Sequence, residues 1–123
     1  MKITSFNPLI VTKDAQAAVK LFEDLGFHPI HNIEVTARSG PVSTVCLEND
    51  GGFRVDVSEA PVPQDLSLIR MNVDDFDEAL AFLEERGFRN HNATGATVDT
   101  ATNKSAMIVS PSGYAFDLCQ HLK

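Results

Sequence analysis

Apolar and polar residues recur with a helical period in two segments of the chain that share one design. The segments are 14–27, DAQAAVKLFEDLGF, and 75–88, DFDEALAFLEERGF, so that Asp14 corresponds to Asp75. Each begins with an aspartate suited to cap a helix, continues with apolar residues three or four positions apart, and ends in Gly-Phe. A glycine there adopts the left-handed backbone that ends many helices. The pattern predicts two amphipathic helices, the first with an apolar stripe of Ala15, Ala18, Val19, Phe22 and Leu25.

The offset that carries Asp14 to Asp75 also relates positions outside the helices. It joins identical residues without an insertion over most of the first half of the chain, which indicates an internal repeat of one supersecondary module. The identical pairs outside the helices are Thr36 and Thr97, Gly52 and Gly113, and Asp56 and Asp117, while Ala18 and Ala79, and Glu23 and Glu84, match inside the helices.

Strand-like segments flank each predicted helix, one before it and three after it. They are rich in β-branched and aromatic residues and are bounded by Gly, Pro, Asn and Asp. The predicted strands are 3–12, 30–37, 42–48 and 53–58, and then 66–73, 88–97, 104–110 and 114–121. We therefore expect one domain, 1–123, with module one at 1–59, a linker at 60–65 and module two at 66–123. The predicted fold class is α+β: two tandem βαβββ modules form a curved mixed sheet around a cleft, with one helix outside each module.

Alternation within the strands assigns side chains to the two faces of the sheet, because successive side chains point in opposite directions. In 53–58 the apolar residues Phe53, Val55 and Val57 should lie under the helix, with Arg54 and Asp56 on the opposite face.

The equivalent strand of module two shows the same division. Phe116 and Leu118 take the helix side, and Asp117 and Cys119 the opposite side.

The opening strands follow the same rule and place three residues of each module away from its helix. These are Asn7, Leu9 and Val11 in module one and Leu68, Arg70 and Asn72 in module two. We expect a candidate ligand site where these faces line a cleft. Its predicted members are Asn7, Arg54, Asp56, Leu68, Arg70, Met107 and Asp117, with Cys46 and Cys119 nearby.

Composition excludes several classes of partner. The net charge of −7 argues against nucleic acid and does not favour an anionic membrane surface. The chain has no apolar run near the roughly 20 residues of a membrane helix and no signal-like start, so we expect a cytoplasmic protein. Cys46 and Cys119 lack the spacing of a metal site and are expected to be reduced, packed thiols.

The repeated module, with VTKDAQAAVKLFEDLGF in its first copy and PSGYAFDLCQ near the end of its second, resembles the vicinal oxygen chelate superfamily. That superfamily contains glyoxalases, bleomycin-resistance proteins and extradiol dioxygenases. The resemblance implies four metal-ligand positions, one on the opening strand and one on the last strand of each module. Here these positions hold Asn7, Asp56, Leu68 and Asp117. Since an amide and an alkyl group replace the usual imidazoles, we expect no metal cofactor; Asp56, Asp117 and Asn7 would be the ligands if one bound.

The charged residues on these faces allow two interpretations. Arg54 and Arg70 could form structural ion pairs with Asp56 and Asp117, since an unpaired buried carboxylate is costly. Alternatively, an arginine binds a carboxylate or phosphate of a ligand while an aspartate orients an amine or hydroxyl. The histidines His28, His31, His91 and His121 occupy none of the four positions, and we expect them on exposed strand ends or loops.

The function that we predict from the sequence is metal-independent binding of a small molecule, as in the glyoxalase and bleomycin-resistance group, by a homodimer with the ligand in the inter-module cleft. The alternative is a metal-dependent glyoxalase-like lyase, isomerase or dioxygenase with a nonstandard metal site. In that case Asp56 and Asp117 would hold an ion that polarises vicinal oxygens of the substrate. A scaffold or regulatory module with a collapsed cleft is a third possibility.

Overall fold

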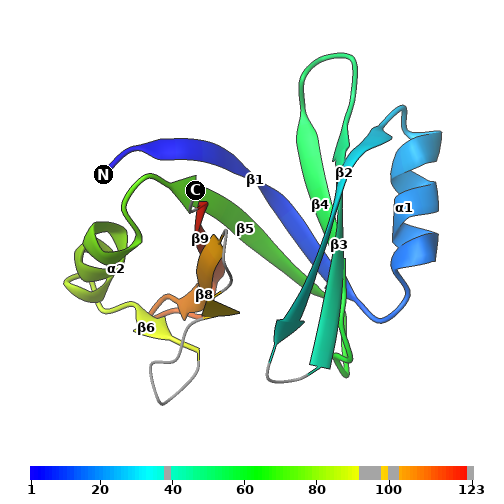
Figure 1. Cartoon of the computed structure of the whole chain (residues 1–123). Coiled ribbons are helices and arrows are strands. Elements are labelled where there is room, and N and C mark those ends of the chain that lie inside the picture. Colours follow the sequence, from blue (N-terminus) through cyan, green and yellow to red (C-terminus); the bar gives the residue numbers. More distant parts are fainter. Residues whose placement is uncertain (38–39, 92–97, 100–102, 122–123) are drawn as a thin grey trace. The chain divides into compact units, whose positions relative to one another are not determined.

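A computed structural model describes residues 1–37, 40–91, 98–99 and 103–121 (Figure 1). The chain forms two compact units, which are described separately. The first unit contains residues 7–67, and the second contains residues 1–6 together with residues 68–123. No helix in the described part of the chain is long and apolar enough to cross a membrane.

The first unit consists of a four-stranded mixed sheet with one helix. Its elements are β1 (Ile3–Thr12, from residue 7 onward), α1 (Ala15–Asp24), β2 (His28–Ala37), β3 (Gly40–Glu48) and β4 (Arg54–Glu59). Strand β4 runs parallel to β1 and antiparallel to β3, and β3 pairs antiparallel with β2. This is the predicted βαβββ arrangement.

The second unit repeats this arrangement. Its elements are β5 (Leu66–Val73, from residue 68 onward), α2 (Phe76–Glu84), β6 (Arg89–Asn90), β7 (Val98–Asp99), β8 (Asn103–Val109) and β9 (Ala115–His121). Strand β9 runs parallel to β5 and antiparallel to β8, which also pairs with β6 and β7. The α+β class and the duplicated module are thereby confirmed.

The beginning of β1 lies beside the end of β5 and so belongs to the second unit. The backbone N–H of Asp74 donates to the carbonyl of Lys2 at 3.0 Å, and the N–H of Lys2 donates to the Asp74 carboxylate at 2.6 Å. The Asn72 amide nitrogen donates to Ser5 Oγ at 2.5 Å. One strand therefore contributes its first residues to one unit and its remaining residues to the other.

Strand register follows the same constant offset as the sequence repeat. Leu9 pairs with Asp56 in the first unit, and Arg70 pairs with Asp117 in the second. The neighbouring antiparallel pair repeats as well, because Cys46 pairs with Asp56 just as Met107 pairs with Asp117. In the segment that corresponds to β2, the described residues form β6 and β7. The predicted strand 88–97 is observed only at Arg89–Asn90, and residues 92–97 lie outside the description.

Both helices begin and end with the predicted residues. The Asp14 side chain accepts from the N–H of Ala17, and the Asp75 side chain accepts from the N–H of Glu78. These bonds satisfy backbone donors that the first helical turn leaves without partners. Gly26 and Gly87 have φ values of 102° and 88°, so each glycine supplies the left-handed residue just beyond its helix.

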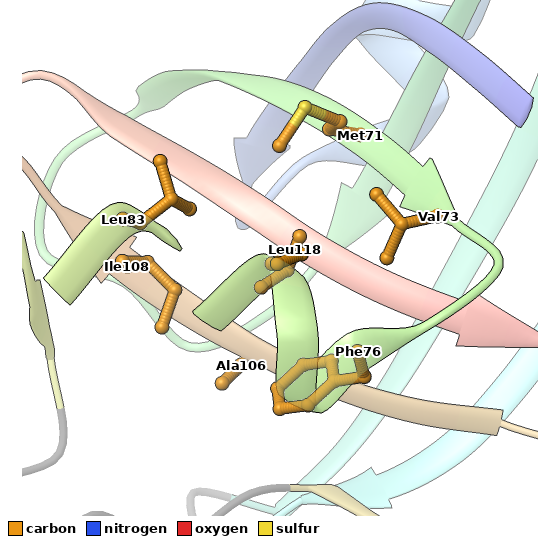
Figure 2. Close-up of a cluster of buried hydrophobic side chains, with 8 residues drawn as sticks. Met71, Val73, Phe76, Leu83, Ala106, Ile108 and Leu118 are labelled. Carbon is orange, nitrogen blue, oxygen red and sulfur yellow. The ribbon is translucent and has the colours of Figure 1, made fainter. Parts of the chain in front are cut away.

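The largest hydrophobic core lies in the second unit, between α2 and its sheet (Figure 2). It consists of Met71, Val73, Phe76, Ala79, Leu83, Ala106, Ile108 and Leu118. In the first unit a smaller core of Leu47, Val55 and Val57 packs against half-buried residues of α1. Val55, Val57 and Leu118 thus lie on the helix side, as alternation predicted, and Phe116 packs against the core.

Two predicted core residues are exposed instead. Phe53 is 69% exposed because it belongs to the turn before β4, where Asn49 Oδ1 accepts from the N–H groups of Gly51 and Phe53. Leu25 is 63% exposed because it caps α1, at the edge of the apolar stripe. The predictions that Phe53 lies under the helix and that Leu25 belongs to the stripe packed on the sheet were wrong.

Candidate functional site

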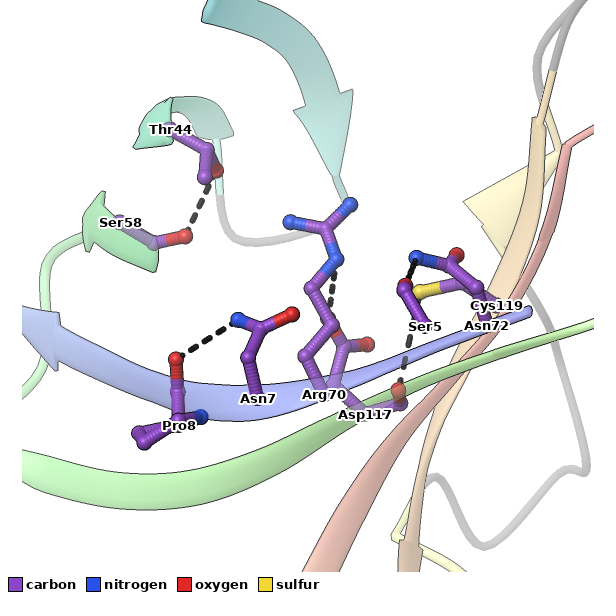
Figure 3. Close-up of polar contacts among 9 residues, drawn as sticks. All are labelled: Ser5, Asn7, Pro8, Thr44, Ser58, Arg70, Asn72, Asp117 and Cys119. Carbon is purple, nitrogen blue, oxygen red and sulfur yellow. Dashed lines mark hydrogen bonds and ion pairs between the residues drawn. The ribbon is translucent and has the colours of Figure 1, made fainter. Parts of the chain in front are cut away.

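The sheet face opposite the helix carries buried polar side chains in the first unit (Figure 3). Thr44 and Ser58 lie opposite each other on β3 and β4, and their hydroxyl oxygens are 2.6 Å apart. The Asn7 amide nitrogen donates to the carbonyl of Pro8 at 3.0 Å. Asp56 lies on the same face, directly beside Leu9 in the parallel ladder, and is 5% exposed. Asn7 and Asp56 therefore occupy one face, as predicted.

Arg54 is the predicted site residue in the first unit with the most exposed side chain. It lies at the start of β4, and its Nε is 2.9 Å from Oε2 of Glu48, which is its register partner on β3. About half of the Arg54 side chain is accessible to solvent. Surface pairs of this kind contribute little stability, so Arg54 is a peripheral member of this face.

The second unit brings a cation and an anion together on its corresponding face. Arg70 on β5 pairs in register with Asp117 on β9, and Arg70 Nε is 3.9 Å from Asp117 Oδ2 (Figure 3). This separation exceeds that of a direct hydrogen bond. Arg70 is only 6% exposed, although a guanidinium is costly to bury. The two charged groups are therefore close enough to attract each other electrostatically.

Two apolar residues predicted for the site accompany this pair. Met107 lies opposite Asp117 on β8, and Leu68 lies two residues before Arg70 on β5. Both side chains are half-buried. The second unit thus brings together Leu68, Arg70, Met107 and Asp117 on one face, while the expected inter-module cleft stays a prediction.

Asn72 is a polar residue of this face to which the sequence assigned no role. Its Nδ2 donates to Ser5 Oγ, and its Oδ1 is buried with no hydrogen-bond partner among the described residues. The internal repeat offers a signal for it, because the equivalent position in module one is Val11. Ser5 could not be found in this way, since its contact with Asn72 spans 67 residues.

Cys119 lies in register with Asn72 and is 1% exposed. Burial raises the pKa of its thiol, and the nearby Asp117 charge raises it further. The thiol therefore stays protonated and is a poor nucleophile. Cys46 and Cys119 are both reduced, as expected.

Three of the histidines, His28, His31 and His91, are exposed, as expected. His28 begins β2, whereas His31 lies within that strand, opposite Cys46, and not at a strand end or in a loop.

The four family positions for metal ligands do not form a suitable donor set. The first unit supplies the Asn7 amide and the Asp56 carboxylate, and the second supplies the alkyl side chain of Leu68 and the Asp117 carboxylate. Transition metals in such proteins are held by imidazole, thiolate and carboxylate groups, and an alkyl group cannot coordinate. Within the described residues no group of three or more His, Cys, Asp or Glu side chains could hold an ion. These residues do not fit a resident metal.

An open depression of about 750 Å³ lies elsewhere, on the helix side of the first unit. Its lining includes Asp14, Lys20, Glu23, Ser43 and Glu59, but none of the predicted site residues. The N–H of Ala15 donates to Glu59 there, and Lys20 pairs with Asp24 at 2.6 Å. Because Asp14 caps α1 and Lys20 and Glu59 have these partners, the Arg70 face is the better candidate site.

Comparison with known structures supports the fold. Glyoxalase I from Zea mays aligns with a TM-score of 0.66 and 16% identity, over 98% of this chain and 44% of that protein. The chain thus spans less than half the length of the maize enzyme. A Vibrio splendidus 12B01 member of the glyoxalase/bleomycin resistance protein/dioxygenase superfamily aligns with a TM-score of 0.57 and 22% identity. The alignment covers 97% of this chain and 99% of that one. A Staphylococcus aureus protein aligns with a TM-score of 0.63 and 13% identity, over 99% of this chain and 98% of that one. At identities this low, the structural alignments show a common fold and nothing further.

A search of curated proteins finds no match. The model of the Glyoxalase/Bleomycin resistance protein/Dioxygenase superfamily, however, matches residues 3–118, which is nearly the whole chain. Together with the duplicated βαβββ module and its repeated strand register, this match shows that the chain belongs to the Glyoxalase/Bleomycin resistance protein/Dioxygenase superfamily.

Proposed function

We propose that this protein binds a small organic molecule without a metal and that Arg70 binds an anionic group of that ligand. The ligand would lie on the face of the second unit opposite α2, with Leu68 and Met107 as apolar neighbours. A guanidinium carries five N–H groups, so it can interact with Asp117 and a ligand carboxylate together. We also propose that the protein acts as a homodimer.

The observation that carries this proposal is the difference between Leu9 and Arg70. The two residues occupy equivalent positions of the repeat, each directly beside the last-strand aspartate, and they are 3% and 6% exposed. Module one shows that the βαβββ fold accepts an alkyl side chain there. The module therefore does not need a buried cation at this position for folding. Binding of an anionic ligand group would account for the presence of Arg70 there.

Asp117 has a complementary role in this proposal. Its carboxylate orients the guanidinium of Arg70 and attracts a ligand amine or hydroxyl group. The competing interpretation is a purely structural pair between Arg70 and Asp117. The two interpretations differ in what the loss of Arg70 does to ligand binding.

Native mass spectrometry of protein purified without chelator tests the proposal. We expect a metal-free dimer that retains an organic mass or takes one up from a mixture of small carboxylates and phosphates. Arg70→Leu, which copies Leu9, should remove this binding while the chain stays folded. Arg54→Leu is the matched control, because Arg54 pairs with Glu48 at the strand end, and it should bind as the wild type does.

Two results would contradict the proposal. Retention of about one divalent metal per chain, lost in Asp56→Ala/Asp117→Ala, would favour the metal-dependent enzyme. Unchanged ligand uptake by Arg70→Leu would reduce the Arg70 and Asp117 pair to a structural feature.

A further inference from the structure

The Asn72 side chain combines burial with an unmet hydrogen-bonding group. The residue is 8% exposed, its Nδ2 donates to Ser5 Oγ, and its Oδ1 has no partner among the described residues. In this orientation the amide oxygen makes no hydrogen bond within the described part of the chain, which is unfavourable in a buried position.

The repeat shows that the fold does not require an amide here. The equivalent residue of module one is Val11, which lies beside Ser58 in the β1 and β4 ladder as Asn72 lies beside Cys119. A valine therefore suits this position of the module. Arg70 and Asn72 are neighbours on one face of the opening strand of module two. The equivalent residues of module one are Leu9 and Val11.

The placement of Asn72 relates it to the proposed anion-binding residue. Arg70 and Asn72 are two residues apart on β5, so their side chains project from the same face with Cα atoms about 6.6 Å apart. Asp117 and Cys119 occupy the adjacent positions on β9. The polar groups at these four positions are the Arg70 guanidinium, the Asp117 carboxylate, the Asn72 amide and the neutral Cys119 thiol.

We infer that Asn72 Oδ1 accepts a hydrogen bond from a hydroxyl or ammonium group that the ligand carries next to the carboxylate bound by Arg70. The ligand class is then 2-hydroxy- or 2-aminocarboxylates. This inference rests on the proposed function and adds the donor group to it. Because Oδ1 is covered in the structure, the atoms above it must move aside on binding, and the hydrogen bond gained favours that change.

Three probes of nearly equal size test the donor group: propionate, L-lactate and L-alanine. They differ at carbon 2, which carries hydrogen, hydroxyl or ammonium. In titrations followed by protein NMR, the wild type should bind lactate, alanine or both at least about tenfold more tightly than propionate, the effect of one well-formed hydrogen bond to a buried acceptor. A preference for alanine over lactate would assign the donor to an ammonium attracted by Asp117.

Asn72→Val, which copies Val11, should reduce this preference to about twofold or less, while propionate still binds. Ser5→Ala removes only the internal partner of Nδ2 and should retain the preference. Thr44→Ser, which copies the equivalent residue Ser105 into the first unit, is the control for unrelated effects. Thermal unfolding of each variant checks that it folds.

The outcomes separate this inference from the proposed function. Equal binding of the three probes by the wild type, or an undiminished preference in Asn72→Val, would overturn the inference alone. If no probe binds but native mass spectrometry finds another organic ligand that depends on Arg70, the inference fails and the proposed function stands. If no organic molecule binds at all, both fail.

Discussion

At the scale of single residues, Cys119 illustrates how position determines chemistry. Its thiol lies in the second unit next to Asp117 and has almost no exposed surface. Burial and the adjacent negative charge both disfavour a thiolate. The residue contributes packing and no charge beside Asp117.

The raised pKa of Cys119 predicts a dependence of stability on pH. Above its ordinary pKa of 9.0 the thiol ionises in the unfolded chain but stays protonated in the folded protein, so the unfolded state gains stability as pH rises. The free energy of unfolding should fall by up to about 1.4 kcal/mol per pH unit above pH 9. Urea unfolding of the wild type and Cys119→Ala between pH 8 and 10 measures this; equal pH slopes in the two proteins would contradict it.

Sequence patterns predicted the face of a residue better than its partner. Alternation placed Arg70, Met107 and Asp117 on one face because strand geometry fixes it. It did not reveal that Arg54 pairs with Glu48, since that choice depends on side-chain reach at a strand end. Phe53 was misplaced because a hydrophobic residue in a turn looks like the first residue of a strand.

At the scale of elements, the two helix ends provide a matched comparison. Gly26 and Gly87 have the same role and similar positive φ values. A Cβ atom at Gly26 would meet no neighbour within 4 Å, whereas one at Gly87 would lie 2.9 Å from Pro111 Cγ. Of these two helix ends, only that of α2 leaves no room for a Cβ atom at its glycine.

Alanine substitutions at these glycines should therefore differ in cost. Gly26→Ala should destabilise by about 1–2 kcal/mol, the cost of a left-handed backbone for a residue with a Cβ. Gly87→Ala should cost more, because Pro111 must also shift. Chemical denaturation measures the free energy of unfolding of both variants. Equal decreases would show that Pro111 moves aside without a measurable cost.

The helices also differ in burial, and their local stability should differ accordingly. No residue of α1 is fully buried, whereas α2 buries Phe76, Ala79 and Leu83. Since helix opening is opposed by tertiary packing, the amides of α1 should exchange with solvent faster than those of α2. Native-state hydrogen exchange tests this prediction, and slower exchange in α1 would contradict it.

Both helices were predictable because their caps and apolar periods are local signals. The aspartate caps and the closing glycines lie within a few residues of the turns that they stabilise. Of the strand expected at 88–97, the described part includes the pairing of Arg89–Asn90 with β8, and residues 92–97 lie outside the described residues. Local periodicity does not identify this pairing partner, because β8 lies well beyond the segment in the sequence.

At the scale of the whole molecule, the constant offset between the two halves of the sequence carried most of the information. It transferred the topology of one half of the chain to the other and gave matching strand registers. The same comparison makes differences informative, since Leu9 and Arg70, or Val11 and Asn72, share a structural position but not a chemistry. Comparison of the two halves could not identify Ser5 as the partner of Asn72, because Ser5 joins the second unit from the opposite end of the sequence.

The divided strand β1 has a consequence for any attempt to separate the halves. A cut in the linker at 60–65 would leave residues 1–6 covalently attached to the wrong fragment, although they hydrogen-bond to Asn72 and Asp74. The C-terminal fragment 66–123 should therefore fold incompletely alone and gain ordered amide signals in NMR spectra when a synthetic peptide of residues 1–12 is added. A peptide with Ser5→Pro, which loses the hydroxyl and a backbone donor, should complement it less well. The repeat in the sequence and the smallest self-sufficient pieces of the protein thus do not coincide.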